Sequence, residues 1–199
     1  QNKQVAKISG TDDVSHRQDP VGWGAFDSSA LIDRRSDTLI EPGENGIVYK
    51  AKLNATFDAK AGKVSVKPEL TKMTYRTPVS RQYGIESSAA AWKNLMWATD
   101  NDGNMICWDA RTLEIVWARA LGDNSDSTPV LDDSTGRPFL FTGNSVGWRG
   151  AERRDQVANL RKIDGLTGDV VWQYDLPAYY DSHGKGGLLS TPLLGRGEV

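Results

Sequence analysis

One short run of this chain has the residue types of a calcium-binding loop. Residues 100–104 read Asp-Asn-Asp-Gly-Asn, with oxygen-bearing side chains on both sides of a glycine. A calcium loop of the EF-hand type also needs a bidentate Glu at its twelfth position, and counting from Asp100 that position holds Arg111. The same residues suit a tight turn between two strands, since Asp, Asn and Gly tolerate left-handed backbone angles. We therefore interpret residues 100–104 as a turn and predict no metal site.

The other residues that could take part in catalysis do not form a catalytic set. His16 and His183 have no Ser or Cys at a recognisable nucleophile elbow, and an ordinary polar loop histidine explains either of them. The glycine-rich run 184–187 lacks the spacing and the following helix of a phosphate-binding loop. Cys107 is the one cysteine and lies in an apolar run, which is typical of a small core residue. We predict no catalytic residues and no resident cofactor.

Two nine-residue segments, 109–117 and 164–172, carry Asp, Thr and Trp at matching offsets. In each copy an apolar run precedes the Asp, a polar turn follows it, and a β-branched run ends in the Trp. This is the pattern of a strand, a tight turn and a second strand. A repeat at such a distance indicates a fold built from one recurring supersecondary unit.

A second repeated pattern marks where each unit begins. Similar segments start at residues 28, 87, 127 and 190, and alignment on Ser29, Ser88, Thr128 and Thr191 gives intervals of 59, 40 and 63 residues. The shortest interval is close to the ~40–45 residues that a four-stranded propeller blade needs. We therefore predict an all-β fold, a β-propeller of four-stranded antiparallel blades, with three complete blades and one innermost strand of a fourth.

The apolar runs and the turns between them predict the individual strands. The first blade has strands at 28–32, 38–41, 47–53 and 63–67, the second at 87–92, 95–99, 105–109 and 114–120, and the third at 127–131, 138–142, 158–163 and 169–176. The three blades then occupy residues 27–77, 78–121 and 122–177. We expect residues 1–26 to hold the outer strand of a preceding blade, at 4–8, and a connecting segment. We expect 178–199 to hold the inner strand of a fourth blade, at 190–194.

The pattern Asp164-x-x-Thr167-Gly168-x-x-x-Trp172 resembles the tryptophan-docking repeat of quinoprotein-type, or PQQ-like, β-propellers. The resemblance covers roughly residues 27–199, and the phrases DSSALID, PGENG and ESSAAAWKN are similar to secreted PQQ-like repeat proteins of anaerobic bacteria. It implies that Trp117 and Trp172 stack between neighbouring blades. It also implies that the outer hairpins are tied together by Asp109, Thr112, Asp164, Thr167 and Gly168. The 109–117 copy departs in carrying Leu113 in the place of Gly168, and the first blade has Lys52 in the Asp place and no Trp.

The resemblance implies a fold more strongly than an activity, because one fold serves many functions. Quinoprotein alcohol or sugar dehydrogenases of this kind hold PQQ and calcium at the propeller axis, and the alcohol dehydrogenases typically carry two adjacent cysteines, which Cys107 alone does not supply. The chain also resembles a non-enzymatic propeller, the lipoprotein that assists outer-membrane protein assembly, which uses the same repeat as a docking surface. We predict a non-catalytic scaffold that is extracellular, at the cell surface or periplasmic, with the dehydrogenase as the alternative.

Composition agrees with a globular all-β protein. The chain has 199 residues, of which 38% are hydrophobic and 25% charged, and its formal net charge is −2. This balance lacks the basic footprint of nucleic-acid binding or of an anionic membrane surface, and no run of ~20 apolar residues predicts a membrane span. Because a blade packs against a neighbour on each side, we expect three blades to be part of a longer propeller or of a ring assembled from several copies.

Blade topology predicts where a ligand binds. The connections between blades and the loops between second and third strands emerge on one face, which we call the long-loop face, and segments 71–86, 143–157 and 177–187 are long. Aromatic rings beside guanidinium groups suit flat, polar or anionic ligands. We expect a protein or glycan partner there, with candidate ligand-binding residues Arg81, Tyr83, Trp148, Arg149, Tyr179, Tyr180 and His183. The alternative is that these aromatic side chains only pin their own loops to the blade edges.

Overall fold

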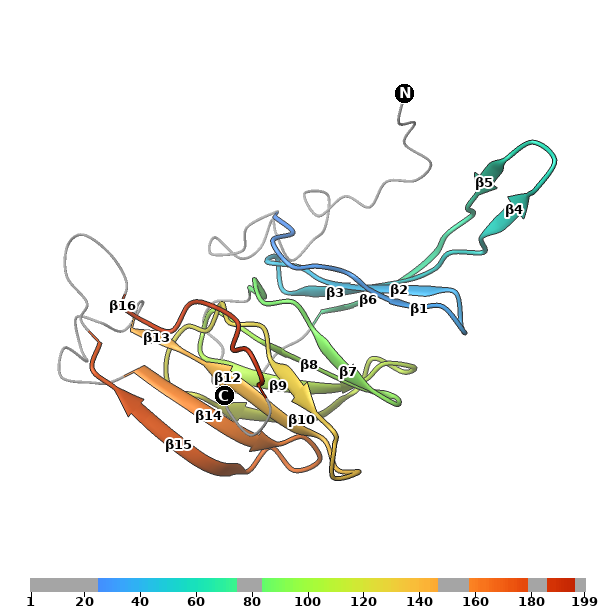
Figure 1. Cartoon of the computed structure of the whole chain (residues 1–199). Coiled ribbons are helices and arrows are strands. Elements are labelled where there is room, and N and C mark those ends of the chain that lie inside the picture. The colour runs from blue at the N-terminus through green and yellow to red at the C-terminus, as the bar shows by residue number, and fades with distance from the viewer. Residues whose placement is uncertain (1–24, 75–83, 147–157, 179–185, 196–199) are drawn as a thin grey trace.

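The structure of the chain, a computed structural model, describes residues 25–74, 84–146, 158–178 and 186–195 (Figure 1). All of the regular structure in these segments is β-strand. Sheet 1 contains β1 (Leu31–Asp33), β2 (Thr38–Pro42), β3 (Ile47–Lys52) and β6 (Glu69–Thr74). Sheet 2 contains β7 (Ala90–Trp92), β8 (Leu95–Thr99), β9 (Asn104–Asp109) and β10 (Ile115–Ala120). Sheet 3 contains β11 (Val130–Asp132), β12 (Phe139–Gly143), β14 (Ala158–Asp164) and β15 (Val170–Leu176).

Each of the three sheets is an antiparallel meander in which strands pair in their order along the chain. Two further pairs of short strands complete the described structure. They are β4 (Thr56–Asp58) with β5 (Lys63–Ser65), and β13 (Ser145–Val146) with β16 (Gly186–Gly187). The three successive four-stranded sheets confirm the predicted fold class, an all-β arrangement of propeller blades.

The hydrophobic core lies between the sheets, because sheet 2 is apolar on both of its faces. Successive side chains of a strand point to opposite faces. One face carries Met96, Ala98, Ile106 and Trp108, which pack with Ile40 and Val48 of sheet 1. The other carries Trp97, Met105, Cys107 and Trp117, which pack with Leu140 and Ile163 of sheet 3. Burial on both faces explains why residues 105–108 form an uninterrupted apolar run.

The hydroxyl residues that align the repeats connect neighbouring sheets. The Ser29 backbone N–H donates to the Ser88 hydroxyl at 2.8 Å, and the Ser88 N–H donates to the Thr128 hydroxyl at 3.0 Å. Positions equivalent in the repeat are therefore adjacent in space. These bonds lie just ahead of the ladders, so the first strands begin at Leu31, Ala90 and Val130, three residues later than predicted.

The fourth strand of sheet 1 was predicted wrongly. The strand was predicted at 63–67, but the fourth strand is β6 (Glu69–Thr74), and all six residues of β6 pair with β3. Residues 63–65 belong instead to the inserted β4–β5 hairpin, which projects away from the sheets (Figure 1). The alternation of Lys63, Val64 and Ser65 fits either assignment, because a two-stranded hairpin and a sheet edge show the same period.

The predicted strand at 190–194 is also absent, since none of the described residues 188–195 is in a strand. A first strand is held by its ladder to the second strand, as β1 is held by β2. No second strand follows residue 194 in the described part of the chain. The other strand expected outside the three blades, at 4–8, lies outside the described residues.

The turn predicted at residues 100–104 is confirmed. Asp100 Oδ1 accepts hydrogen bonds from the Asn104 backbone N–H at 2.7 Å and from the Asp102 N–H at 3.1 Å. Gly103 has a φ of +79° and sits against the backbone of Asp123, where a Cβ would lie 2.4 Å from the carbonyl oxygen. The acidic and amide groups of this run therefore stabilise a tight turn between β8 and β9.

Candidate functional site

Two tryptophans fill the space between sheets 2 and 3. Trp97 on β8 and Trp117 on β10 both pair with Cys107, so they stand on one face of sheet 2. Both indole N–H groups donate to the carbonyl oxygen of Gly165, at 3.0 and 3.1 Å. Gly168, with a φ of +76°, permits this close approach, because a Cβ there would lie 2.8 Å from the Trp117 ring. Trp117 is accordingly only 7% exposed.

The repeated Asp and Thr residues organise their own turns. Asp109 Oδ1 accepts from the backbone N–H groups of Arg111 and Thr112, and Asp164 Oδ1 accepts from those of Leu166 and Thr167. The Thr112 and Thr167 hydroxyls each accept from the N–H two residues further on. The Arg111 guanidinium, at 3.2 Å, holds the pKa of Asp109 well below its usual range. These groups hold the turns that follow β9 and β14, and their role in tying the outer hairpins together stays a prediction.

Trp172 lies on the matching face of sheet 3, in a row with Phe141 and Lys162. Its ring meets that of Phe141 edge to face, with 5.9 Å between the centroids. Trp172 is 36% exposed, since no further sheet covers this row in the part of the chain that the structure describes. Its stacking between two blades stays a prediction.

Sheet 1 lacks the aromatic row of sheet 2. The equivalent ladder positions hold Ile40 on β2, Lys50 on β3 and Thr71 on β6. A cavity of about 530 Å³ lies between sheets 1 and 2, and we call it the inter-sheet groove. The residues that matter below are Ile40, Lys50, Lys93, Met96, Ala110 and Arg111. Ala110 occupies the repeat position of Gly165, so the groove corresponds to the space that two indoles fill between sheets 2 and 3.

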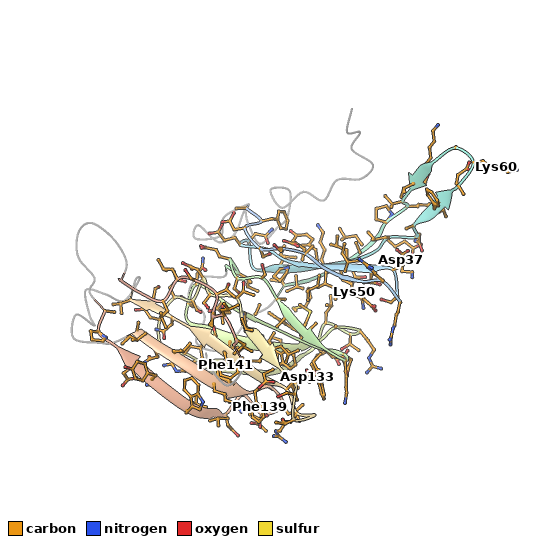
Figure 2. All side chains as sticks on the ribbon, in the orientation of Figure 1. Asp37, Lys50, Lys60, Asp133, Phe139 and Phe141 are labelled. Carbon is orange, nitrogen blue, oxygen red and sulfur yellow. The ribbon has the colours of Figure 1, made fainter. Side chains whose placement is uncertain are left out.

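The inter-sheet groove has an apolar floor and a cationic rim. Ile40 and Met96 are buried in the core beneath it. Lys50, labelled in Figure 2, donates from its ammonium to the Arg111 carbonyl oxygen at 2.5 Å. The Lys93 ammonium lies 3.9 Å from the centroid of the Trp92 ring. The one acidic residue of the lining, Asp33, accepts hydrogen bonds from Arg35 and Ser36 within its own turn.

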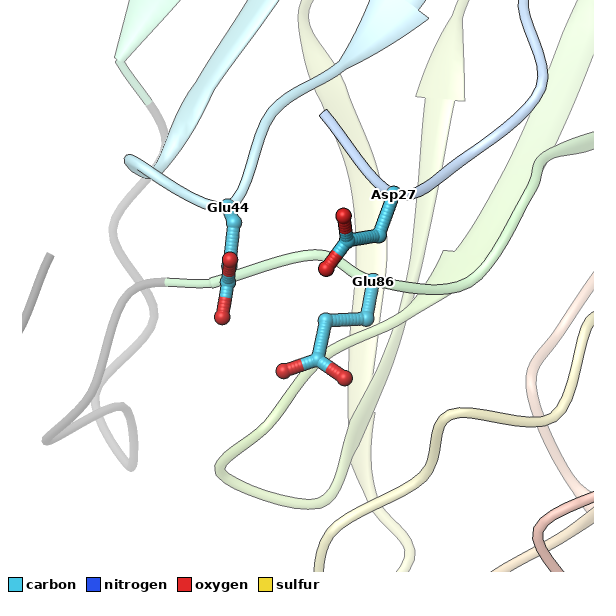
Figure 3. A group of neighbouring side chains, drawn as sticks. All are labelled: Asp27, Glu44 and Glu86. Carbon is cyan, nitrogen blue, oxygen red and sulfur yellow. The ribbon is translucent and has the colours of Figure 1, made fainter. Parts of the chain in front are cut away.

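Three carboxylates meet at the long-loop face (Figure 3). Asp27 precedes β1, Glu44 lies in the turn between β2 and β3, and Glu86 precedes β7; one oxygen of each lies within 4.8 Å of the others. Glu44 is only 7% exposed. Burial, then a hydrogen bond with Glu86 and the nearby negative charges, raise the pKa of Glu44 to about 7. The Asn101 amide donates to Glu86 Oε1 at 2.7 Å.

Sequence reasoning missed this cluster, because its members come from three separate connecting segments whose spacing follows no motif. Carboxylate oxygens are ligands that calcium prefers, so the three carboxylates of this cluster suit the calcium ion that the dehydrogenase alternative requires. The quinone has no matching cysteine pair, since Cys107 is buried between sheets 2 and 3. The seven candidate residues of the long-loop face, Arg81, Tyr83, Trp148, Arg149, Tyr179, Tyr180 and His183, lie outside the described residues, and their role stays a prediction.

Comparison with known proteins finds similarity to solved structures only. No protein-family profile matches it, and no curated protein does. Among solved structures it is similar to BamB from Moraxella catarrhalis, with 14% identity, a TM-score of 0.46 and coverage of 75% of this chain and 37% of that one. It is also similar to a europium-containing methanol dehydrogenase, with 14% identity, a TM-score of 0.46 and coverage of 82% and 28%. The chain thus spans well under half of either structure.

The three sheets and the contacts between them define the class of this protein: it is built from four-stranded β-propeller blades joined face to face. None of its described residues belongs to a helix that could span a bilayer.

Proposed function

We propose that this protein is a non-catalytic scaffold that binds another protein outside the cytoplasm. The observation that carries the proposal is the β4–β5 hairpin, an insertion between β3 and β6 that has no equivalent between the third and fourth strands of sheets 2 and 3. All six of its strand residues are exposed. A projecting element without its own core is suited to contact a partner rather than to stabilise the blade that carries it.

The hairpin is amphipathic. Phe57 and Val64 are directly opposite each other in its ladder and therefore share a face, on which they are 67% and 62% exposed. The neighbouring pairs, Thr56 with Ser65 and Asp58 with Lys63, are polar and share the other face. Isolated two-stranded hairpins are marginally stable in water unless one face packs on something. An apolar pair on such a hairpin supports docking into an apolar surface of a protein partner.

The base of the hairpin is tied to the blade, which presets its direction. The Ala55 N–H donates to the Asp37 carboxylate at 2.8 Å, and the Asn54 side chain donates to the Lys67 carbonyl at 3.0 Å. At the far end, around Lys60, the Lys60 and Ala61 N–H groups donate to Asp58 (Figure 2). Order at both ends reduces the entropy that binding must overcome.

Site-specific photocrosslinking tests this function. A photoreactive phenylalanine analogue replaces Phe57 in one variant and Val116, an exposed residue of β10, in the control. In envelope extract, we expect one discrete protein adduct from position 57 and none from position 116. The purified adduct partner should bind the unmodified protein, and the double change F57S and V64S should abolish that binding at an unchanged melting temperature.

Three results would overturn the scaffold proposal. Equal crosslinking from both positions would show that the hairpin is an ordinary surface. Selective binding on a glycan array with no protein partner would identify a sugar-binding protein. Absorbance from a bound quinone after addition of PQQ and calcium, with dye-linked oxidation of alcohols or sugars, would identify the dehydrogenase.

A further inference from the structure

We propose that the inter-sheet groove binds a peptide segment of a partner protein that carries a tryptophan next to acidic residues. The groove lies between sheets 1 and 2, whereas the hairpin projects from sheet 1, so this inference does not depend on the scaffold function proposed above. Its basis is the internal repeat, because the molecule itself shows what occupies the equivalent space between sheets 2 and 3.

Between sheets 2 and 3, the space is filled by the indoles of Trp97 and Trp117, which share the Gly165 carbonyl. Between sheets 1 and 2, the same ladder positions hold Ile40 and Thr71. Neither side chain has the area of an indole, and a groove of about 530 Å³, with Ile40 in its lining, lies between these two sheets. That volume lies within the ~300–1,000 Å³ typical of ligand sites. An indole supplied by another chain would therefore replace the missing ring.

Backbone groups of the groove suit an indole as well. Ala110, at the repeat position of Gly165, lies in the lining. Its N–H donates to the Asn94 carbonyl at 2.7 Å, as the Gly165 N–H donates to the Pro138 carbonyl at 2.9 Å, so the two turns are held alike. The Ala110 carbonyl accepts no hydrogen bond from another described residue. An inserted indole N–H would donate to this oxygen, as Trp97 and Trp117 donate to Gly165.

The rim of the groove adds a preference for negative charge. Lys50, Lys93 and Arg111 come from three different elements and all line the groove. Arg111 already pairs with Asp109, but its side chain is 75% exposed and a guanidinium has five donor hydrogens. Asp33 is occupied within its own turn. Acidic residues flanking the tryptophan would meet these three cations, and charge complementarity of this kind accelerates association and rejects basic partners.

Direct binding of short synthetic peptides tests the inference with the intact protein. One peptide has a central Trp flanked by Glu, the second keeps the Trp but has Lys in place of Glu, and the third keeps the Glu but has Ala in place of Trp. We expect binding of the first by fluorescence anisotropy, at least tenfold weaker binding of the other two, and loss of affinity as salt is raised.

Four variants locate the bound peptide. Thr71→Trp places an indole of the protein itself at the repeat position that Trp117 occupies in sheet 2, so it should block peptide binding and raise the melting temperature. Lys50→Glu should weaken binding about tenfold or more, since it places like charges together. Lys67→Glu, an exposed change outside the groove, is the matched control and should leave the affinity unchanged. Lys93→Glu repeats the charge test if Lys50→Glu lowers the melting temperature.

The inference is overturned if the Trp and Glu peptide does not bind at about 1 mM, or if Thr71→Trp folds and leaves its affinity unchanged. Equal binding of the Ala peptide would also overturn it, because the groove would then recognise charge alone. A hairpin that fails to crosslink would not affect any of these measurements, so failure of the scaffold proposal remains distinguishable.

Discussion

At the scale of single residues, the two tryptophans of the repeat have unequal environments. Trp117 is buried against Gly165 and Gly168 at the next sheet, whereas Trp172 contacts Phe141 and is 36% exposed. Residues at equivalent positions of the repeat therefore contribute unequally to the free energy of unfolding, since the contribution of an aromatic ring follows the area that it buries.

Trp117→Ala should destabilise the protein by ~3–5 kcal/mol, the range for deleting a large buried aromatic side chain. Trp172→Ala is expected to cost less than about 2 kcal/mol, because part of the ring is already in water. Urea unfolding of the two variants measures the difference. Equal costs would show that Trp172 is covered as completely as Trp117.

Cys107 should be inert in the folded protein. Burial raises the pKa of its thiol to about 12, so almost no thiolate exists at neutral pH, and the side chain has no exposed surface. We expect iodoacetamide to modify it only in denaturant, at a rate that follows unfolding. Rapid alkylation at pH 8 without loss of structure would contradict the buried assignment.

Gly103→Ala should destabilise the protein by at least about 2 kcal/mol. The new Cβ would meet the Asp123 backbone, and the φ of +79° is unfavourable for alanine. Gly136→Ala is the control, because its φ is +80° but nothing lies within 4 Å of the added carbon. Similar costs for both changes would mean that backbone strain alone, not the contact, sets the penalty.

At the scale of elements, the β4–β5 hairpin is an addition to a blade that is complete without it. β6 pairs with β3 over six residues, and the Lys67 N–H donates to the Leu53 carbonyl at 2.9 Å, which closes the base. The ladder of the blade is therefore complete without the hairpin.

Replacing residues 56–65 by a two-glycine turn should change the free energy of unfolding by no more than ~0.5 kcal/mol, as for other exposed surface changes. The same deletion should abolish partner capture. Thermal unfolding and the capture assay on one preparation check both. A large loss of stability would show that the hairpin packs on residues beyond those described.

At the scale of the whole molecule, stability in the absence of divalent cations should fall as the pH rises. The pKa of Glu44 is raised from 4.5 to about 7 in the folded state by burial, then by Glu86, Asp27 and Asp126. Between these values the folded protein binds more protons than the unfolded chain. The stabilisation is therefore complete below about pH 4.5 and is lost as the pH passes about 7.

Urea titrations in EDTA at pH 5.5 and pH 8 measure this effect, and Glu44→Gln is the control. The variant should lose most of the difference between the two pH values. A wild-type protein equally stable at both pH values would contradict the raised pKa. Glu44 belongs to the first blade and Glu86 to the second. The cluster therefore lies at the long-loop face, where sheets 1 and 2 meet.

The amino-acid sequence by itself determined the blade register of this protein. The uninterrupted apolar run of β9, the Asp-to-Trp repeat and the aligned hydroxyls are local patterns, and local patterns dictate strands and turns. Lys63 to Ser65 marks the limit of such patterns, since a period of two does not distinguish a blade strand from a projecting hairpin.

Only the tertiary structure decided what the gaps and junctions of the molecule contain. The carboxylates of Asp27, Glu44 and Glu86 meet because three connecting segments converge, and no sequence spacing encodes that convergence. Ile40, in the lining of the inter-sheet groove, and Thr71 stand where the next sheet carries indoles, a relation that requires the ladder register of both sheets. Strands follow from neighbouring residues, whereas sites form from residues that folding brings together over long separations.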